Sequence, residues 1–322
     1  MKEITPRFGI SATVTVPGSK SLTQRALLVA ALADGRSELL GPLDSEDTEY
    51  TSMALQAMGI QVQKQKDRWL VDGRGGRIAT PEESIYLGNN GTATRFLTSF
   101  ACLGSGLFRI VGDKRMEERP IEPLMQALRG WGASLESVKG TGCPPLEIRA
   151  SGLVGGKTLL PEGKSSQYLS SLLLVAPYAR QEAELDVAGE VLSKPYVAMT
   201  LAVMEAFGRP AEANAACNHF VIPPGVYRAR TYQIEGDASG ASYFFAAAAV
   251  SRGRVMVSNM PHPSLQGDAV FVDLLERMGC RVEKTPAGTC VEGSDKLQGI
   301  TVDMGDCPDV VPTLAVVAAM AH

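Results

Sequence analysis

The sequence predicts an α/β protein made of repeated βαβαββ-like units that group into two globes. Two observations support this prediction. A helix end, a glycine and a strand recur every 71–76 residues, and a second set of strongly apolar helices recurs every 70–75 residues. A chain of 322 residues, 45% of them apolar, is long enough to bury two cores. Such units bury their helices by grouping, so we expect globes rather than isolated repeats.

The first recurring pattern places a glycine directly after an amphipathic helix. The glycines are Gly59, Gly132, Gly208 and Gly279, and an alternating strand follows in most copies. Glycine in this position is typical of a left-handed helix cap. The helices that precede them should lie nearer to solvent, and they are predicted at residues 48–58, 122–131, 195–207 and 268–278.

The second pattern is a small polar cluster that opens a strongly apolar helix. These helices are predicted at residues 26–32, 93–102, 168–176, 243–250 and 312–321. They are apolar nearly all round, so we expect them to be buried. Copies one to three predict one globe at residues 16–234, and residues 1–15 with 235–322 predict part of a second globe.

Counting the copies sets an expectation for the second globe. Two globes of three units each need six copies, whereas this chain contains four and a half. We therefore expect roughly 100–120 residues to be missing from the second globe. The last helix would then expose an apolar face. A natural protein of four and a half copies is the alternative.

Composition excludes several classes of protein. The 31 basic and 35 acidic residues give a net charge of −4, which provides no field for nucleic acid. No apolar run is long enough to span a membrane, so no membrane partner is expected. The six cysteines form no CxxC pair, which argues against a zinc site or a disulfide framework. Free thiols favour a cytoplasmic location.

The first apolar helix opens with residues suited to an anion. Unpaired backbone N–H groups and the helix dipole favour negative charge at a helix start. Lys20 supplies a point charge, Ser21 supplies a hydroxyl, and Arg25 lies one turn further along the same face. A simple helix cap with two solvated cations is the alternative for this segment alone.

The other helix openings have a similar composition. Asn89 and Thr92 offer side-chain donors around Gly91, and Arg119 precedes an amphipathic helix after a charged run. Hydroxyls and an amide gather at two more helix starts, namely Lys164, Ser165, Ser166 and Gln167, followed by Ser193 and Tyr196. Each opening alone is equally consistent with an ordinary turn or N-cap. Together they predict a small, multiply anionic ligand that is rich in hydroxyls.

Asp309 opens the fifth apolar helix. There the helix dipole would keep its carboxylate ionised, so it is a candidate to accept a proton from a substrate hydroxyl. An N-cap aspartate is the alternative.

These segments resemble the 5-enolpyruvylshikimate-3-phosphate (EPSP) synthase family, also named 3-phosphoshikimate 1-carboxyvinyltransferase. The resemblance runs from Val16 to Ala321, and it rests on PGSKSLTQRALL, GNNGTATRF, DKRMEERPIEPL, SSQYLSSLLLVAP, LSKPYVAMT, EGDASGASYFFAAAA and the CPD at residues 307–309. It implies an inside-out α/β barrel of two globes. It also implies transfer of the enolpyruvyl group of phosphoenolpyruvate to the 5-hydroxyl of shikimate 3-phosphate, with release of phosphate and without metal or organic cofactor.

The resemblance also implies roles for individual residues. The positions that match shikimate 3-phosphate contacts are Lys20, Ser21, Arg25, Ser165, Ser166, Gln167, Ser193, Tyr196 and Asp309. The positions on the phosphoenolpyruvate side are Lys20, Asn89, Gly91, Thr92, Arg119 and Gln167. Lys20 and Asp309 are implied to be catalytic, Asp309 through proton transfer at the 5-hydroxyl. A complete enzyme is expected to be a cytoplasmic monomer of the shikimate pathway.

Two departures from the family pattern stand out. Phe96 follows Arg95 where many members carry proline or leucine, and this residue could alter tolerance of the inhibitor glyphosate. Gly91 is retained, so we expect glyphosate still to compete with phosphoenolpyruvate. The second departure is at the end, because the family's later acidic, arginine and lysine segments have no counterpart before His322.

Two other functions compete with this interpretation. A UDP-amino-sugar enolpyruvyl transferase would carry asparagine after the first-loop lysine and a cysteine near Arg119, whereas Ser21 follows Lys20 and residues 112–120 contain no cysteine. The other alternative is a truncated, non-catalytic remnant that binds shikimate 3-phosphate without turnover.

Overall fold

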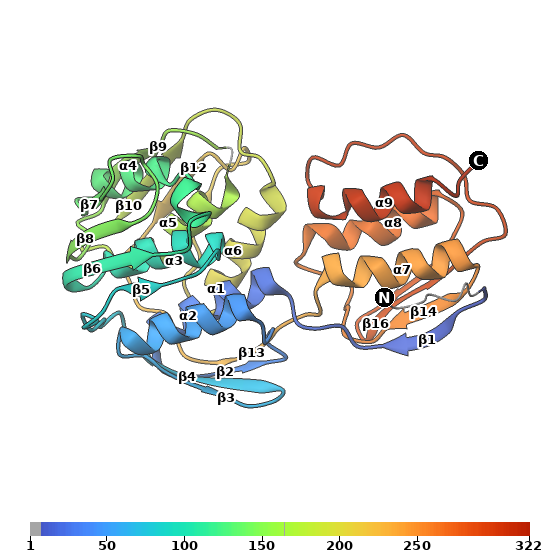
Figure 1. Ribbon diagram of the computed structural model, residues 1–322, viewed down its shortest axis with the longest axis horizontal. Coiled ribbons are helices and arrows are strands. Elements are labelled where there is room, and N and C mark those ends of the chain that lie inside the picture. Colours follow the sequence, from blue (N-terminus) through green and yellow to red (C-terminus); the bar gives the residue numbers. More distant parts are fainter. Residues whose placement is uncertain (1–7, 164) are drawn as a thin grey trace. The chain divides into compact units, whose positions relative to one another are not determined.

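The computed structural model describes residues 8–163 and 165–322, and its chain forms two compact units. The larger unit spans Lys20–Ile234, and the smaller unit combines Met1–Ser19 with Glu235–His322. The sequence had placed the first of these boundaries between residues 15 and 16. The first seven residues of the expected second globe and Lys164 lie outside the described residues. Figure 1 shows the elements of both units along the chain.

The larger unit alternates deeply buried helices with helices nearer to its surface. The buried helices are α1 (Lys20–Leu32), α3 (Gly91–Ala101) and α5 (Ser166–Val175). The others are α2 (Glu46–Ala57), α4 (Glu122–Gly130) and α6 (Lys194–Ala206), with short 3₁₀ turns η1 (Met116–Glu118) and η2 (Ala176–Tyr178). The interior helices α1, α3 and α5 pack on one another, which buries their apolar residues on all sides.

The described strands of the larger unit form three small sheets of one design. The first has the order β13 (Thr231–Gln233), β2 (Asp34–Leu40), β4 (Arg68–Arg74), β3 (Gln61–Lys64). The second is β5 (Ile85–Tyr86), β6 (Ser105–Val111), β8 (Leu146–Ser151), β7 (Ser134–Ser137). The third is β9 (Gly156–Leu160), β10 (Ala183–Val187), β12 (His219–Ile222), β11 (Glu212–Ala213). Each begins with a parallel pair and continues with two antiparallel pairs.

The smaller unit repeats the same design once. Its sheet has the order β1 (Ser11–Val14), β14 (Arg254–Val257), β16 (Gly288–Glu292), β15 (Arg281–Thr285), with one parallel pair followed by two antiparallel pairs. Its helices are α7 (Ala238–Ser251), η3 (Gly267–Val270), α8 (Phe271–Arg277), η4 (Pro308–Val310) and α9 (Val311–Ala318). The predicted α/β class and repeated βαβαββ units are therefore confirmed.

The four recurring glycines are left-handed caps, as predicted. Gly59, Gly132, Gly208 and Gly279 have φ of 84°, 86°, 81° and 100°, and each directly follows the C-cap residue of its helix. Glycine adopts this conformation without the strain that a Cβ would add. The glycine repeat thus marks where each surface helix turns back into its sheet.

The prediction that the apolar helices are buried is right for α1, α3 and α5 and wrong for α7, whereas the apolar face that α9 exposes was expected for the last helix. In α7 the side chains of Tyr243 and Phe244 are exposed, and in α9 those of Val311 and Val316 are exposed. Helix α7 packs against α8, α9, β14 and β16, and these contacts cover part of its circumference. Helix α9 also ends at Ala318, before the predicted end at residue 321. Among the described residues, no helix is long and apolar enough to cross a membrane.

Candidate active site

The start of α1 carries a buried arginine. Arg25 is only 2% exposed, and its guanidinium donates to Thr200 Oγ1 (2.8 Å), Ser170 Oγ (3.0 Å) and the Ser21 carbonyl (2.9 Å). It also donates to the carbonyl of Tyr196 (3.3 Å). Arg25 therefore joins α1 to α5 and α6 through neutral partners.

The charge of Arg25 is not neutralised by a carboxylate among the described residues. Its guanidinium lies 5.5 Å from the ring centroid of Phe96 and 5.9 Å from that of Tyr196. Burial lowers the pKa of Arg25 to about 10, so the side chain is still positively charged at neutral pH. A buried cation with neutral partners is costly for folding and well suited to binding an anion.

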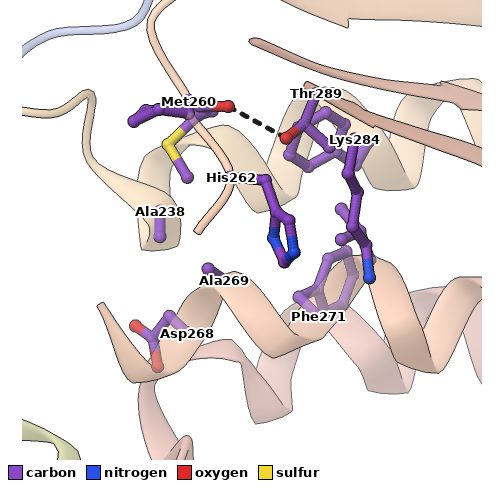
Figure 2. Close-up of a pocket in the computed structure, with 11 residues that line it drawn as sticks. Ala238, Met260, His262, Asp268, Ala269, Phe271, Lys284 and Thr289 are labelled. Carbon is purple, nitrogen blue, oxygen red and sulfur yellow. Dashed lines mark hydrogen bonds between the residues drawn. The ribbon is translucent and has the colours of Figure 1, made fainter. Parts of the chain in front are cut away.

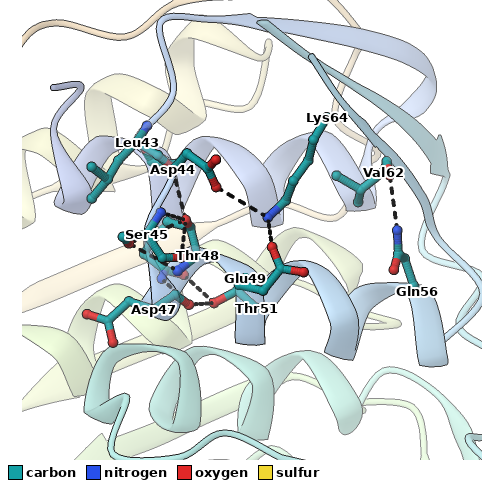
Figure 3. Close-up of polar contacts among 12 residues, drawn as sticks. Leu43, Asp44, Ser45, Asp47, Thr48, Glu49, Thr51, Gln56, Val62 and Lys64 are labelled. Carbon is teal, nitrogen blue, oxygen red and sulfur yellow. Dashed lines mark hydrogen bonds and ion pairs between the residues drawn. The ribbon is translucent and has the colours of Figure 1, made fainter. Parts of the chain in front are cut away.

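Lys20, at the first position of α1, lies beside the first turn of α2. Its Nζ lies 3.4 Å from Asp47 Oδ2, and both side chains are partly exposed. The carbonyl of Asp47 accepts hydrogen bonds from Gln24 Nε2 (3.3 Å), Thr51 Oγ1 (3.0 Å) and Asn90 Nδ2 (2.7 Å). Figure 3 shows Asp47 and Thr51 among the polar contacts at the start of α2. One backbone group thus links the starts of α1, α2 and α3.

Two arginines, Arg95 of α3 itself and Arg119 at the end of η1, lie beside Gly91 at the start of α3. Asn90 caps the helix by accepting from the N–H of Ala93 (2.9 Å), while Asn89 is exposed. A Cβ at Gly91 would stand 2.5 Å from Nη1 of Arg95 and 2.6 Å from Nη1 of Arg119. Both guanidiniums therefore lie over the first residue of α3, where a side chain would displace them.

The start of α5 faces this arginine pair. Ser165 occupies the N-cap position, but its side chain makes no capping hydrogen bond, so the N-cap alternative does not explain its hydroxyl. Gln167 Oε1 accepts from Arg95 (2.8 Å), and Arg95 lies 5.4 Å from the ring centroid of Tyr168. The Nε of Arg95 is buried and has no hydrogen-bond partner in the described structure.

The start of α6 contains a strained backbone. Ser193 has a φ of 52° and makes no side-chain capping bond, although it occupies the N-cap position. A left-handed conformation costs energy for a residue other than glycine, and such residues concentrate at functional sites. Tyr196, one turn further on, contributes the carbonyl and the ring that contact Arg25.

The larger unit thus brings together most of the predicted site residues. Arg25 contacts Ser21 and Tyr196 directly, Arg95 donates to Gln167, and Arg95 and Arg119 both lie beside Gly91. Ser165, Ser166, Thr92 and Ser193 occupy the first residues of α3 or α5 or the N-cap positions of α5 and α6. Asp309 lies in the smaller unit, in η4, one residue before the N-cap of α9, so it does not cap that helix.

The smaller unit has its own acidic group near Asp309. Asp268 is 4% exposed, accepts a hydrogen bond from Ser239 Oγ, and has one buried oxygen without a partner in the described structure. Burial raises its pKa, Ser239 lowers it, and the charges of Asp309 and Asp237 raise it further. Figure 2 shows Asp268 at the edge of a cavity of about 20 Å³, which is large enough for about one water molecule.

Arg95 belongs to the GNNGTATRF motif, but the sequence alone predicted no role for it. The sequence also predicted no role for Ser170 and Thr200, the hydroxyls that hold Arg25. The signal for Arg95 was its position one turn after Gly91, on the same helix face. No comparable signal existed for Ser170 and Thr200, because they meet Arg25 only through the packing of α1, α5 and α6.

A group of possible metal ligands occurs elsewhere in the larger unit. Glu184, Asp186 and His219 place one ligand atom each within 4.8 Å of the others on neighbouring strands. Lys157 pairs with both carboxylates at 2.9 Å, and His219 Nδ1 lies 2.7 Å from Asp186. The lysine therefore already supplies a positive charge to this cluster.

Fold and site together define a class of protein. It is an α/β protein of repeated βαβαββ units in which several helix starts hold cations and hydroxyls for a small, multiply anionic ligand.

Comparisons with known proteins identify the family. A family model for EPSP synthase (3-phosphoshikimate 1-carboxyvinyltransferase) matches residues 4–322. The chain is 44% identical to the 3-phosphoshikimate 1-carboxyvinyltransferase of Methanosphaerula palustris, over 97% of this chain and 74% of the relative. It is 43% identical to that of Syntrophobacter fumaroxidans, over 99% and 76%. The solved EPSP synthase of Acinetobacter baumannii has the same fold, with a TM-score of 0.85 at 24% identity, covering 98% of this chain and 73% of that one. The chain belongs to the EPSP synthase family of enolpyruvyl transferases.

Proposed function

We propose that this chain transfers the enolpyruvyl group of phosphoenolpyruvate to the 5-hydroxyl of shikimate 3-phosphate. The products are 5-enolpyruvylshikimate 3-phosphate and phosphate, in the pathway to aromatic amino acids. Family membership supports the reaction, and the buried, carboxylate-free cation Arg25 is the structural observation that carries the proposal. Each substrate carries more than one negative charge, so both need cations and helix starts.

Shikimate 3-phosphate is assigned to the side of the site built around Arg25. Arg25 and Lys20 would bind its anionic groups, and Ser21, Ser165, Ser166, Gln167, Ser193 and Tyr196 would bind its phosphate and hydroxyl oxygens. Arg25 is already held by four hydrogen bonds, so its guanidinium is oriented before the ligand arrives. Such preorganisation favours affinity because little conformational freedom remains to be lost.

Phosphoenolpyruvate is assigned to the arginine pair over Gly91. Arg119 and Arg95 would bind its carboxylate or phosphate, together with Lys20, Asn89, Thr92 and Gln167. The absent side chain of Gly91 leaves room for both guanidiniums at the helix start, where they can bind the anion. Arg95 is added to the residues that the sequence implied, because it contacts Gln167 and flanks the same glycine.

The chemistry requires acid–base groups at two atoms. Addition joins the 5-oxygen to C2 of phosphoenolpyruvate while the hydroxyl loses a proton and the methylene carbon gains one. Elimination then removes a methyl proton and phosphate. We assign Asp309 to accept the hydroxyl proton and Lys20 to stabilise the developing negative charge.

Phosphate release by the 322-residue chain tests this proposal. Its intact mass is verified first, and phosphate release is then measured with both substrates, alongside calorimetric binding of shikimate 3-phosphate. Turnover that depends on both substrates supports the proposed function. Binding without turnover supports the non-catalytic alternative, and turnover with a UDP-amino sugar in place of shikimate 3-phosphate supports the other enolpyruvyl transferase.

We also propose that the protein works in the cytoplasm as a monomer. All six cysteines are free, which is consistent with a reducing compartment. Light scattering coupled to size exclusion tests the oligomeric state, and a dimer mass at micromolar concentration would contradict a monomer. Cell fractionation tests the location.

A further inference from the structure

The larger unit contains a basic groove that the proposed reaction does not use. The groove has a volume of about 510 Å³ and lies between the start of β2, the turn after β4 and the segment before β13. Its lining residues are Asp34, Gly75, Arg77, Val226, Tyr227, Arg228 and Ala229. This volume lies within the range of small-molecule sites.

Five arginines occur on or near the groove, and they fall into two groups. Three of them donate to backbone carbonyls: Arg74 to Gly59, Arg209 to Val226 and Arg230 to Ala206. Helix C-termini and turns present carbonyls that arginine side chains commonly bind, so the positions of these three arginines need no ligand to explain them. The remaining two, Arg77 and Arg228, line the groove itself and need a different explanation.

Arg77 and Arg228 have no side-chain hydrogen bond or ion pair within residues 8–163 and 165–322. Both are exposed, and the stem of Arg228 lies over Gly208, where a Cβ would be 3.4 Å from its Cδ. Asp34 is the carboxylate that lines the groove, and in the described structure it forms no ion pair with either arginine. Two unpaired guanidiniums in a concave surface concentrate anions.

The groove is separate from the proposed active site. Lys20 begins α1 and Asp34 follows its end, and a helix of 13 residues is about 20 Å long. The active-site residues occupy helix starts, whereas the groove lies beyond the end of α1. A single small ligand cannot contact both.

We propose that this groove is a second anion site, which binds the phosphate group of a small, hydroxyl-bearing molecule between Arg77 and Arg228. Guanidinium groups bind phosphate oxygens through paired, charge-assisted hydrogen bonds. The carboxylate of Asp34 accepts a hydrogen bond from a hydroxyl of the ligand, and Val226 and Ala229 pack against its carbon frame. This assignment does not depend on the proposed reaction.

Nuclear magnetic resonance of arginine side chains tests the site directly. The full chain is labelled with ¹⁵N-arginine and titrated with inorganic phosphate, glucose 6-phosphate or uncharged glucose. We expect the Nε–H signals of Arg77 and Arg228 to shift with both phosphates and not with glucose. Glucose 6-phosphate should bind about fivefold more tightly than phosphate, since one good hydrogen bond is worth about 1 kcal/mol.

Variants separate this site from the proposed active site. The Arg25→Met protein should keep the shifts of Arg77 and Arg228, whereas the double variant Arg77→Ala/Arg228→Ala should keep the shifts at Arg25. Arg149→Ala, which removes an exposed arginine paired with Glu147, should leave both sites unchanged. Circular dichroism checks that each variant is folded.

Three results would overturn the inference. The first is the loss of the Arg77 and Arg228 shifts in Arg25→Met. The second is that glucose shifts the Arg77 and Arg228 signals as much as the phosphates do. The third is that phosphate and glucose 6-phosphate bind with equal affinity, both to the parent protein and to Asp34→Asn, which would remove the role of Asp34. Failure of turnover in the enzymatic assay would leave this site unaffected, because none of these measurements involves turnover.

Discussion

The two units build the same strand arrangement around helices of similar composition, yet they bury those helices to different extents. Phe100, in α3 of the larger unit, is 0% exposed, whereas Phe244, in α7 of the smaller unit, is 41% exposed. Three repeats surround the interior helices of the larger unit. In the smaller unit, α7 packs on α8, α9 and a single sheet, and α9 packs on α7, so part of each helix faces solvent.

This difference shows that an apolar helix does not determine its own burial. The composition of α9 is as apolar as that of the interior helices, but Val316 is 61% exposed. Burial depends on how many neighbours the fold places around the helix. Substitutions in the two units should therefore have unequal effects.

The largest expected difference comes from one residue type placed in both units. Phe100→Ala should lower the free energy of unfolding of the larger unit by about 3–5 kcal/mol, because it leaves a cavity in a closed core. Phe244→Ala should cost the smaller unit less than about 1 kcal/mol, because the ring is already partly in water. Trp69 and Trp131 both lie in the larger unit, so their fluorescence reports its unfolding in urea.

Hydrogen exchange across α7 measures the effect of Phe244→Ala on the stability of the smaller unit. Equal losses for Phe100→Ala and Phe244→Ala would mean that the exposed face of α7 is covered in solution, and the contrast between the units would then disappear.

The next effect separates stability from binding in the larger unit. Arg25→Met should weaken shikimate 3-phosphate binding about 100-fold, since charge-assisted hydrogen bonds to a phosphorylated ligand are lost. Phosphoenolpyruvate binding should fall less. The free energy of unfolding should stay within about 1 kcal/mol, because an unneutralised buried charge contributes little net stability.

Calorimetry and urea denaturation of the same samples check both parts, with Arg149→Met as the exposed control. Equal losses for the two substrates would show that Arg25 does not belong to the shikimate 3-phosphate side.

Most of the fold could be predicted because it repeats. The glycine caps at Gly59, Gly132, Gly208 and Gly279 recur every 71–76 residues, and local conformation alone requires them. The exposure of Phe244 could not be predicted from helix composition, because it depends on what packs around α7. The exposed face of α9, which includes Val316, was expected from the number of repeats and not from its composition. Local signals therefore gave the elements, and tertiary packing determined their burial.

The candidate site divides in the same way. Lys20, Arg25 and Gly91 were found because helix starts with small and cationic residues have a recognisable composition. The hydrogen bonds of Arg25 to Ser170 and Thr200 span 145 and 175 residues of sequence, so no local pattern reveals them.

A smaller effect is expected at Gly91. In Gly91→Ala the new Cβ would stand 2.5–2.6 Å from the two guanidiniums, so Arg95 and Arg119 must move. Phosphoenolpyruvate should bind about tenfold more weakly, as one charge-assisted hydrogen bond is lost. Shikimate 3-phosphate binding should not change.

Gly240→Ala in α7 is the matched control, since its Cβ would make an ordinary 3.5 Å contact. Competition by glyphosate against phosphoenolpyruvate gives a second measure, and an unchanged affinity for both compounds would remove the arginine pair from this role.

The smallest effect is a pH dependence that belongs to the smaller unit. Burial raises the pKa of Asp268 above its usual 3.8, so the folded state binds a proton that the unfolded state has released. The stability of the wild-type unit should therefore fall as the pH rises above about 4 and through the folded-state pKa. Asp268→Asn removes this loss, while its amide oxygen still accepts from Ser239. The stability of Asp268→Asn relative to wild type should therefore be greater at pH 8 than at pH 4.

Ser239→Ala should act in the opposite direction, because the hydroxyl lowers the pKa of Asp268. Hydrogen exchange across α7 at both pH values measures the change, and a wild-type minus Asp268→Asn difference that is constant with pH would show that Asp268 is ionised in the folded unit as it is in the unfolded chain.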